Sequence, residues 1–94
     1  MVDNLIRSVP EHLSLNIDLA KIKTKNIFKW IKSNNITDRE MIKTFNCGVG
    51  FCLIVKKENI NKIKKYFSKQ YMPYEIGFIS KNKKKINIFN KIKW

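Results

Sequence analysis

The chain has 94 residues, 44% of them hydrophobic, and its 20 basic and 7 acidic residues give a formal net charge of +13. This length and apolar share indicate one small folded domain over residues 1–94 and exclude a wholly disordered chain. The chain has no apolar run long enough for a membrane span, no pattern of a secretory signal, and too few cysteines for a disulfide framework. We therefore expect a cytoplasmic protein with no membrane partner.

The positive charge has two possible sources. Lys, Ile and Asn supply 18, 15 and 11 residues, and all three can be encoded by A and T alone, so drift of a genome toward A and T would enrich them together. A nucleic-acid-binding module would use arginine for bidentate contacts, yet arginine occurs only at Arg7 and Arg39. Compositional drift is the favoured source, although a charge of +13 still predicts weak, salt-sensitive attraction to nucleic acid.

Periodic patterns divide the first half of the chain into helices and a strand. They predict a helix over residues 3–9, a half-buried strand over 13–19, a helix over 26–35 and another from residue 37. Pro10 ends the first helix because proline cannot continue it. The last helix begins with a capping box, in which Thr37 and Glu40 satisfy first-turn backbone groups, and it buries Met41, Ile42 and Phe45.

The second half contains the remaining strands. Its patterns predict a strand over residues 48–55, a helix over 58–70, and strands over 74–79 and 85–92 joined by a polar turn at 81–84. Residues 48–55 are apolar on both faces, which is typical of a central strand. The resulting order predicts an α+β (α/β layered) fold, with a mixed sheet of about four strands and helices packed on it.

The residue types that catalysis uses are scattered. His12 is the one histidine and falls in an expected exposed loop, the acidic residues are dispersed, and residues 48–50 match no nucleotide-binding glycine loop. Cys47 and Cys52 would face opposite sides of a strand, so we expect no metal site. Cys52 is expected in the core, and Cys47 in a turn is the better candidate for a functional thiol. The chain cannot be a complete phosphoryl-transfer enzyme by itself.

Two segments are candidates for binding a ligand. Residues 44–50, Thr-Phe-Asn-Cys-Gly-Val-Gly, place two glycines before the apolar strand, where the backbone can approach a ligand and its N–H groups can meet an anion. The start of the first helix offers Asn4 and Arg7 for a phosphate. Each segment also has an alternative interpretation that stays open. Residues 44–50 could be a tight turn that only packs, and Arg7 could be a solvated surface charge.

The same segments resemble a known family. Residues 44–50 strongly resemble the signature near the C-terminus of phosphoribosylformylglycinamidine cyclo-ligase, also called AIR synthetase. Residues 3–10, 27–31 and 74–77 are similar to that family's Glu-Asn-Ile-Pro-Arg-Val-Leu-Pro helix, Phe-x-Trp-Leu helix and Ile-Gly strand. Ile6 replaces the family's proline, and Phe51 stands where methionine is usual. The resemblance covers nearly all of this chain but only the C-terminal part of the family's chain.

The resemblance implies an activity, cofactors and partners. The family uses ATP and magnesium to close the imidazole ring of formylglycinamidine ribonucleotide, which gives aminoimidazole ribonucleotide in de novo purine biosynthesis. ATP and magnesium are held mainly by an N-terminal half that lies outside this chain, and family members are homodimers. We therefore expect this chain to bind neither cofactor, to be inactive alone and to need that ATP-binding half as its partner.

The resemblance also implies site residues. By position, Asn4 and Arg7 on the first helix and Asn46, Cys47, Gly48 and Gly50 in the turn would position substrate or phosphate. The interpretation predicts that these two segments lie side by side and form part of the wall of a nucleotide-processing pocket. Two alternatives remain: a small basic nucleic-acid-binding module, although no specific nucleic acid is expected, and a non-functional remnant of a degraded gene.

Overall fold

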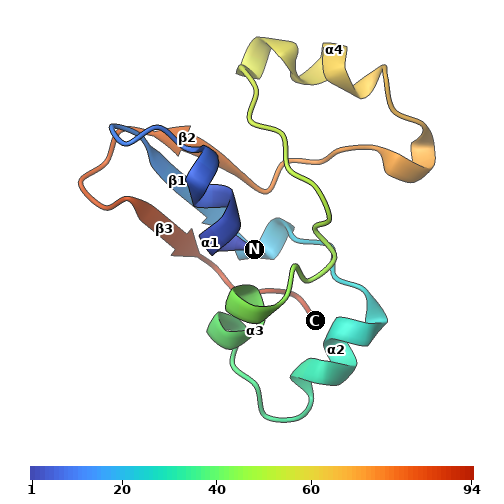
Figure 1. Ribbon diagram of the computed structural model, residues 1–94. Helices are drawn as coiled ribbons and strands as arrows, with labels where there is room; N and C mark the ends of the chain where they lie inside the picture. The colour runs from blue at the N-terminus through green and yellow to red at the C-terminus, as the bar shows by residue number, and fades with distance from the viewer.

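A three-stranded mixed sheet forms the centre of the structure, a computed structural model that describes residues 1–94 (Figure 1). Strand β1 (Ser14–Asp18) lies between β2 (Gly77–Ser80), to which it is antiparallel, and β3 (Ile86–Phe89), to which it is parallel. Helices pack against this sheet, so the α+β prediction is confirmed. The sheet has three strands instead of about four.

Strand β1 is buried on both faces, so its prediction as a half-buried strand was wrong. Leu15 and Ile17 face the apolar core, and Asn16 on the opposite face is only 3% exposed. The Asn16 amide nitrogen donates to Ser80 Oγ at 2.8 Å, and its oxygen accepts from Asn87 Nδ2 at 3.1 Å. A polar side chain can be buried when its hydrogen bonds are satisfied, and this network makes β1 the central strand.

The structure has four short α-helices. They are α1 (Val2–Leu5), α2 (Asn26–Lys32), α3 (Asp38–Thr44) and α4 (Ile60–Lys64). The first helix continues as a 3-10 turn over Ile6–Ser8 and stops before Pro10, as predicted. The helix predicted over residues 58–70 is shorter than expected, because only α4 and the 3-10 turns Lys57–Asn59 and Lys69–Tyr71 form there.

Local sequence explains the limits of α2 and α3. Thr37 Oγ1 accepts a hydrogen bond from the Glu40 N–H at 3.2 Å and caps α3. After α2, Asn35 takes a positive φ of 64°, the left-handed conformation that commonly ends a helix. Trp94 Nε1 donates to Asp38 Oδ1 at 2.8 Å and ties the end of the chain to α3.

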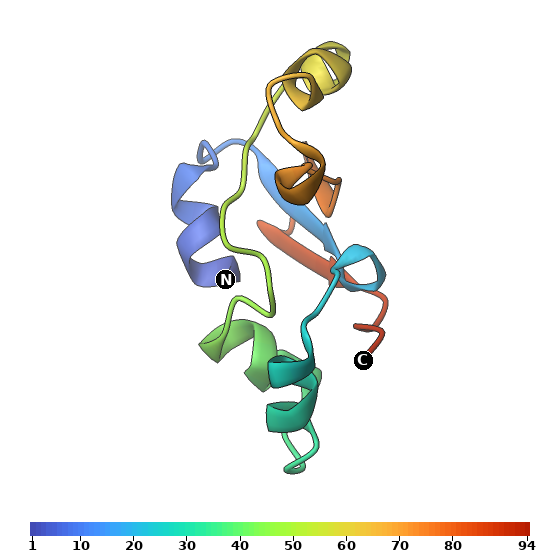
Figure 2. The ribbon, with the colours of Figure 1, turned by 90° about the vertical axis from the view of Figure 1, so that its right-hand side faces the viewer.

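The apolar core lies where α1, α3 and one face of the sheet meet. Its buried members are Val2, Val9, Leu15, Ile17, Leu19, Ile22, Met41, Ile42, Cys47 and Ile92. Helices α2 and α3 lie at one end of the molecule and α4 at the other, in both views (Figures 1 and 2). No helix of the structure combines the length and the apolar character that a membrane span requires.

The strand predicted over residues 48–55 does not form. Residues 50–56 have no regular secondary structure, and Phe51 and Leu53 are 86% and 49% exposed. Both edges of β1 are already paired, with β2 and β3, so residues 48–55 have no place beside the central strand. The predicted polar turn at residues 81–84 joins β2 to β3, which are not neighbours, and the Asn82 N–H donates to Ser14 Oγ at 3.2 Å as it passes β1.

Residues 51–76 form an arm that projects from the sheet and carries α4 (Figures 1 and 2). The radius of gyration is 14.0 Å, whereas a compact chain of this length would have about 12 Å. Only 12 of the 94 residues are buried. The two halves of the molecule therefore differ: the sheet with α1 to α3 is packed, and the arm is open.

Candidate functional site

The first helix and the turn after α3 lie side by side and line an open cavity of about 540 Å³. The Met1 amino group donates to the Ile42 carbonyl at 3.0 Å, which fastens the start of α1 to α3. The cavity is lined by Met1, Asn4, Leu5, Ser8, Thr44, Phe45, Asn46, Val49, Gly50, Phe51 and Cys52. Segments about 40 residues apart in the sequence thus lie side by side, as the sequence predicted.

Local hydrogen bonds and backbone geometry hold the turn that follows α3. Asn46 Oδ1 accepts from the Gly48 N–H at 3.0 Å, and the Val49 N–H donates to the Asn46 carbonyl at 2.9 Å. Cys47 and Gly48 have positive φ angles of 52° and 99°. A Cβ at Gly48 would lie 2.9 Å from the Lys23 carbonyl oxygen, so glycine permits this close approach. Because Asn46 Oδ1 is engaged within the turn, its exposed Nδ2 is the group left to donate to a ligand.

The six predicted site residues fall in four places. Asn4, Asn46 and Gly50 line the cavity. Cys47 is fully buried beneath the turn, and Gly48 lines the neighbouring groove instead. Arg7 is exposed on the 3-10 turn that continues α1 and is not part of the cavity lining.

Sequence reasoning missed two hydroxyl groups. Ser8 and Thr44 both line the cavity and are exposed. Ser8 follows Asn4 by four residues, and this spacing places two side chains on one face of a helix, so the helical pattern could have identified it. Thr44 is the last residue of α3 and begins the seven-residue segment, but no spacing rule pointed to its side chain.

The electrostatics of the site suit neutral polar groups. No charged side chain is among the lining residues, and no three His, Cys, Asp or Glu side chains lie close enough together to hold a metal ion. Burial raises the pKa of both thiols, Cys47 and Cys52, so both stay protonated near neutral pH. A protonated thiol is a weak nucleophile, so the cavity is better suited to positioning a ligand than to attacking it.

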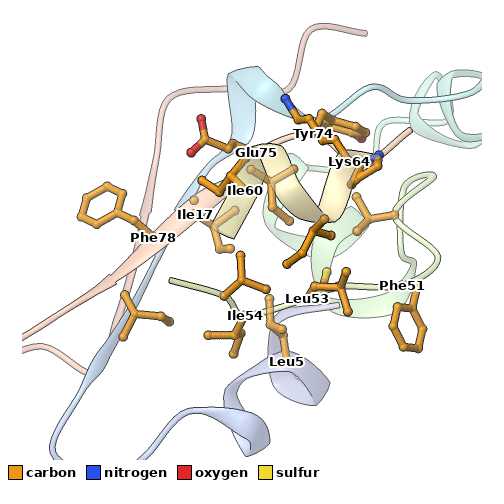
Figure 3. A pocket seen from close by; sticks show the side chains of 18 of the residues that line it. Leu5, Ile17, Phe51, Leu53, Ile54, Ile60, Lys64, Tyr74, Glu75 and Phe78 are labelled. Atoms are coloured by element: carbon orange, nitrogen blue, oxygen red, sulfur yellow. The ribbon is translucent and has the colours of Figure 1, made fainter. Parts of the chain in front are cut away.

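A larger apolar groove adjoins the cavity. Its volume is about 1280 Å³, and it lies between the sheet, α1 and the arm (Figure 3). Leu5, Phe51, Leu53, Ile54 and Ile60 are among the apolar side chains that line it. Cys52, predicted in the core, is half-buried and lines both hollows. The groove was not predicted, because residues 48–55 were assigned to the interior of the sheet.

Comparisons with known proteins point to one family. The model of a family described as "AIR synthase related protein, C-terminal domain" matches residues 1–88. The bifunctional purine biosynthetic protein ADE5,7 of Saccharomyces cerevisiae is 36% identical over 64 residues. That match covers 67% of this chain but 8% of the yeast protein, so the chain spans a small part of that relative. No solved structure matches the chain.

Proposed function

The chain belongs to the C-terminal domain family of AIR synthase related proteins, and from this premise we propose that it acts in purine biosynthesis as part of an AIR synthetase. The proposed reaction is the ATP-dependent closure of formylglycinamidine ribonucleotide to aminoimidazole ribonucleotide. One observation carries the proposal beyond family membership: two of the segments that carry the resemblance, α1 and residues 44–50, line a single cavity.

The proposed role of this chain is to position the substrate. Asn46 Nδ2 and the Asn4 amide would donate hydrogen bonds to hydroxyl or amide oxygens, because the side chains that line the cavity are neutral. Gly50 would let a ligand approach the backbone, since a Cβ there would meet no atom within 4 Å. Arg7 is proposed to contact the substrate phosphate from the exposed turn beside α1. Cys47 and Gly48 would act indirectly, by keeping the turn in its conformation.

We propose that this chain by itself holds neither ATP nor magnesium. Magnesium prefers carboxylate oxygens and phosphate, and the acidic side chains here form no group of three. We propose that both are held by a separate ATP-binding half, which would supply activation of the formyl oxygen by phosphoryl transfer. The isolated 94 residues would then be inactive, and the active species would be the assembly of both halves.

The test is to combine the chain with the ATP-binding half of a family member and follow formation of aminoimidazole ribonucleotide. We expect turnover only in the mixture. Asn46→Ala should lower kcat/KM by about tenfold to a hundredfold, the range expected when a positioning hydrogen bond to the reacting substrate is lost. Asn61→Ala is the matched control, because Asn61 is an exposed asparagine on the distant α4 and its loss should leave the rate unchanged. A stable assembly of the two halves without ring closure would contradict the proposal.

A second candidate function is sequence-independent binding of single-stranded nucleic acid. It is favoured by an aromatic pair on the sheet face opposite the core, where the rings of Phe78 and Phe89 lie 6.5 Å apart and are 57% and 39% exposed. Exposed lysines follow both strands, at positions 81, 83, 84 and 91. Proteins bind single-stranded nucleic acid with aromatic rings on which the bases stack and with positive charges that attract the phosphate backbone. Binding that disappears at physiological salt, or that survives Phe78→Ala, would remove this candidate.

A further inference from the structure

We propose that residues 51–55 form a docking edge for an apolar β-strand of another polypeptide, one that carries carboxylates next to the strand, where they meet Lys56 and Lys57. We call these residues, Phe51–Val55, the open edge. The inference concerns a protein–protein contact and does not depend on the enzyme proposed above. It rests on three observations: the unpaired backbone, the exposed apolar side chains and the local charge.

The backbone of the open edge is unpaired. No N–H or C=O group of residues 51–55 takes part in a hydrogen bond with another group of the protein. The segment is non-helical over its whole length. A row of free backbone groups is a template for pairing with an added strand. Five residues in the extended conformation span about 17 Å at about 3.3 Å per residue, which is a common length for a strand in a sheet.

The side chains of the open edge are of the kind that strands bury. Phe51, Leu53, Ile54 and Val55 are all exposed, and all are strongly apolar. They line the groove of about 1280 Å³, and residues 77–79 of the edge strand β2 line the same groove (Figure 3). An added strand would therefore gain main-chain hydrogen bonds from the open edge and bury its own apolar side chains in the groove.

The positive charge around the groove favours acidic residues next to the added strand. Lys56, Lys57 and Lys64 line the groove, against one carboxylate, Glu75. Lys56 and Lys57 directly follow the open edge in sequence, so carboxylates beside the incoming strand would meet them. A second copy of this chain is disfavoured, because it would bring another net charge of +13 and the same lysines to the contact.

The experiment uses the whole chain and a labelled nine-residue peptide, EEVTVTVEE, with blocked ends. Its five central residues match the length of the open edge, and KKVTVTVKK is the control with the same strand and opposite flanks. By fluorescence anisotropy at low salt we expect the acidic peptide to bind at least tenfold more tightly. Leu53→Pro, which removes one N–H from the open edge, should weaken this binding at least tenfold.

Charge reversal separates the proposed contact from general attraction to a basic protein. The Lys56→Glu/Lys57→Glu variant should lose the preference for acidic flanks. The Lys83→Glu/Lys84→Glu variant makes the same change in net charge at exposed lysines outside the groove, and it should keep the preference. Circular dichroism checks that each variant remains folded.

Three outcomes would overturn the proposal. The first is equal binding of the two peptides, and the second is an equal loss of binding in both charge-reversal variants. The third is a chain that sediments as a dimer and becomes a monomer in Leu53→Pro, because the open edge would then belong to a second copy.

Discussion

At the scale of single residues, Gly48 and Gly50 differ in a way that a mutation can measure. Gly48 has a φ of 99°, and a Cβ there would lie 2.9 Å from the Lys23 carbonyl oxygen. Gly48→Ala should therefore lower the free energy of unfolding by about 1–3 kcal/mol. Gly50→Ala should change it by less than about 0.5 kcal/mol, because no atom lies within 4 Å of that position. Urea denaturation measures both, and equal midpoints would contradict the described turn.

The buried thiol of Cys47 makes stability depend on pH. Burial raises the pKa of this thiol, with a smaller raising effect from Asp38 and an opposing one from the N-terminal amino group. Below the unfolded pKa, about 8.5, both states keep the proton and the contribution to stability is complete. As pH rises above that value the unfolded chain loses its proton first, so the free energy of unfolding falls.

We therefore expect the wild-type free energy of unfolding to decrease between about pH 8 and pH 10. In Cys47→Ala the decrease should be smaller, because one of the two thiols with a raised pKa is gone. Urea denaturation at several pH values gives the slope for each protein. Identical slopes would show that the Cys47 thiol titrates alike in the folded and unfolded states.

At the scale of elements, the accuracy of the sequence-based predictions follows the range of the interactions involved. Helices α1 and α3 were predicted because Pro10 and the Thr37 cap are local signals in the sequence, and α2 because its apolar residues recur at helical spacing. The sheet was harder to predict. Which strand is central depends on partners far away in sequence, such as Asn87, which donates a hydrogen bond to Asn16. The alternation of apolar and polar residues within 13–19 contains no information about such partners.

The candidate site shows the same difference between features set by local sequence and features set by long-range packing. The resemblance of residues 44–50 and of the first helix to one family predicted that the two segments would meet, and the cavity confirms this contact. It could not predict that Cys47 would be buried or that Arg7 would lie outside the cavity lining. These outcomes depend on the positive φ at Cys47 and on the short extent of α1, which are set by packing.

At the scale of the whole molecule, the chain has a packed part and an open part. The packed part contains β1 and the core around it, and the open part is the arm with its exposed apolar residues. Large exposed apolar patches are typical of sites where another protein binds. The same arm borders the candidate cavity through Phe51 and Cys52, so a partner that covers the arm would also change the shape of the cavity.

Amide hydrogen exchange can test this division directly. Protection requires a stable hydrogen bond, so amides of residues 51–55 should exchange within seconds at neutral pH, whereas those of β1 should be the slowest in the chain. Adding the peptide EEVTVTVEE should slow exchange in residues 51–55 and leave β1 unchanged, because β1 is already paired on both edges. Strong protection of residues 51–55 in the isolated chain would contradict the open edge. It would mean that this segment already has a backbone partner within the 94 residues.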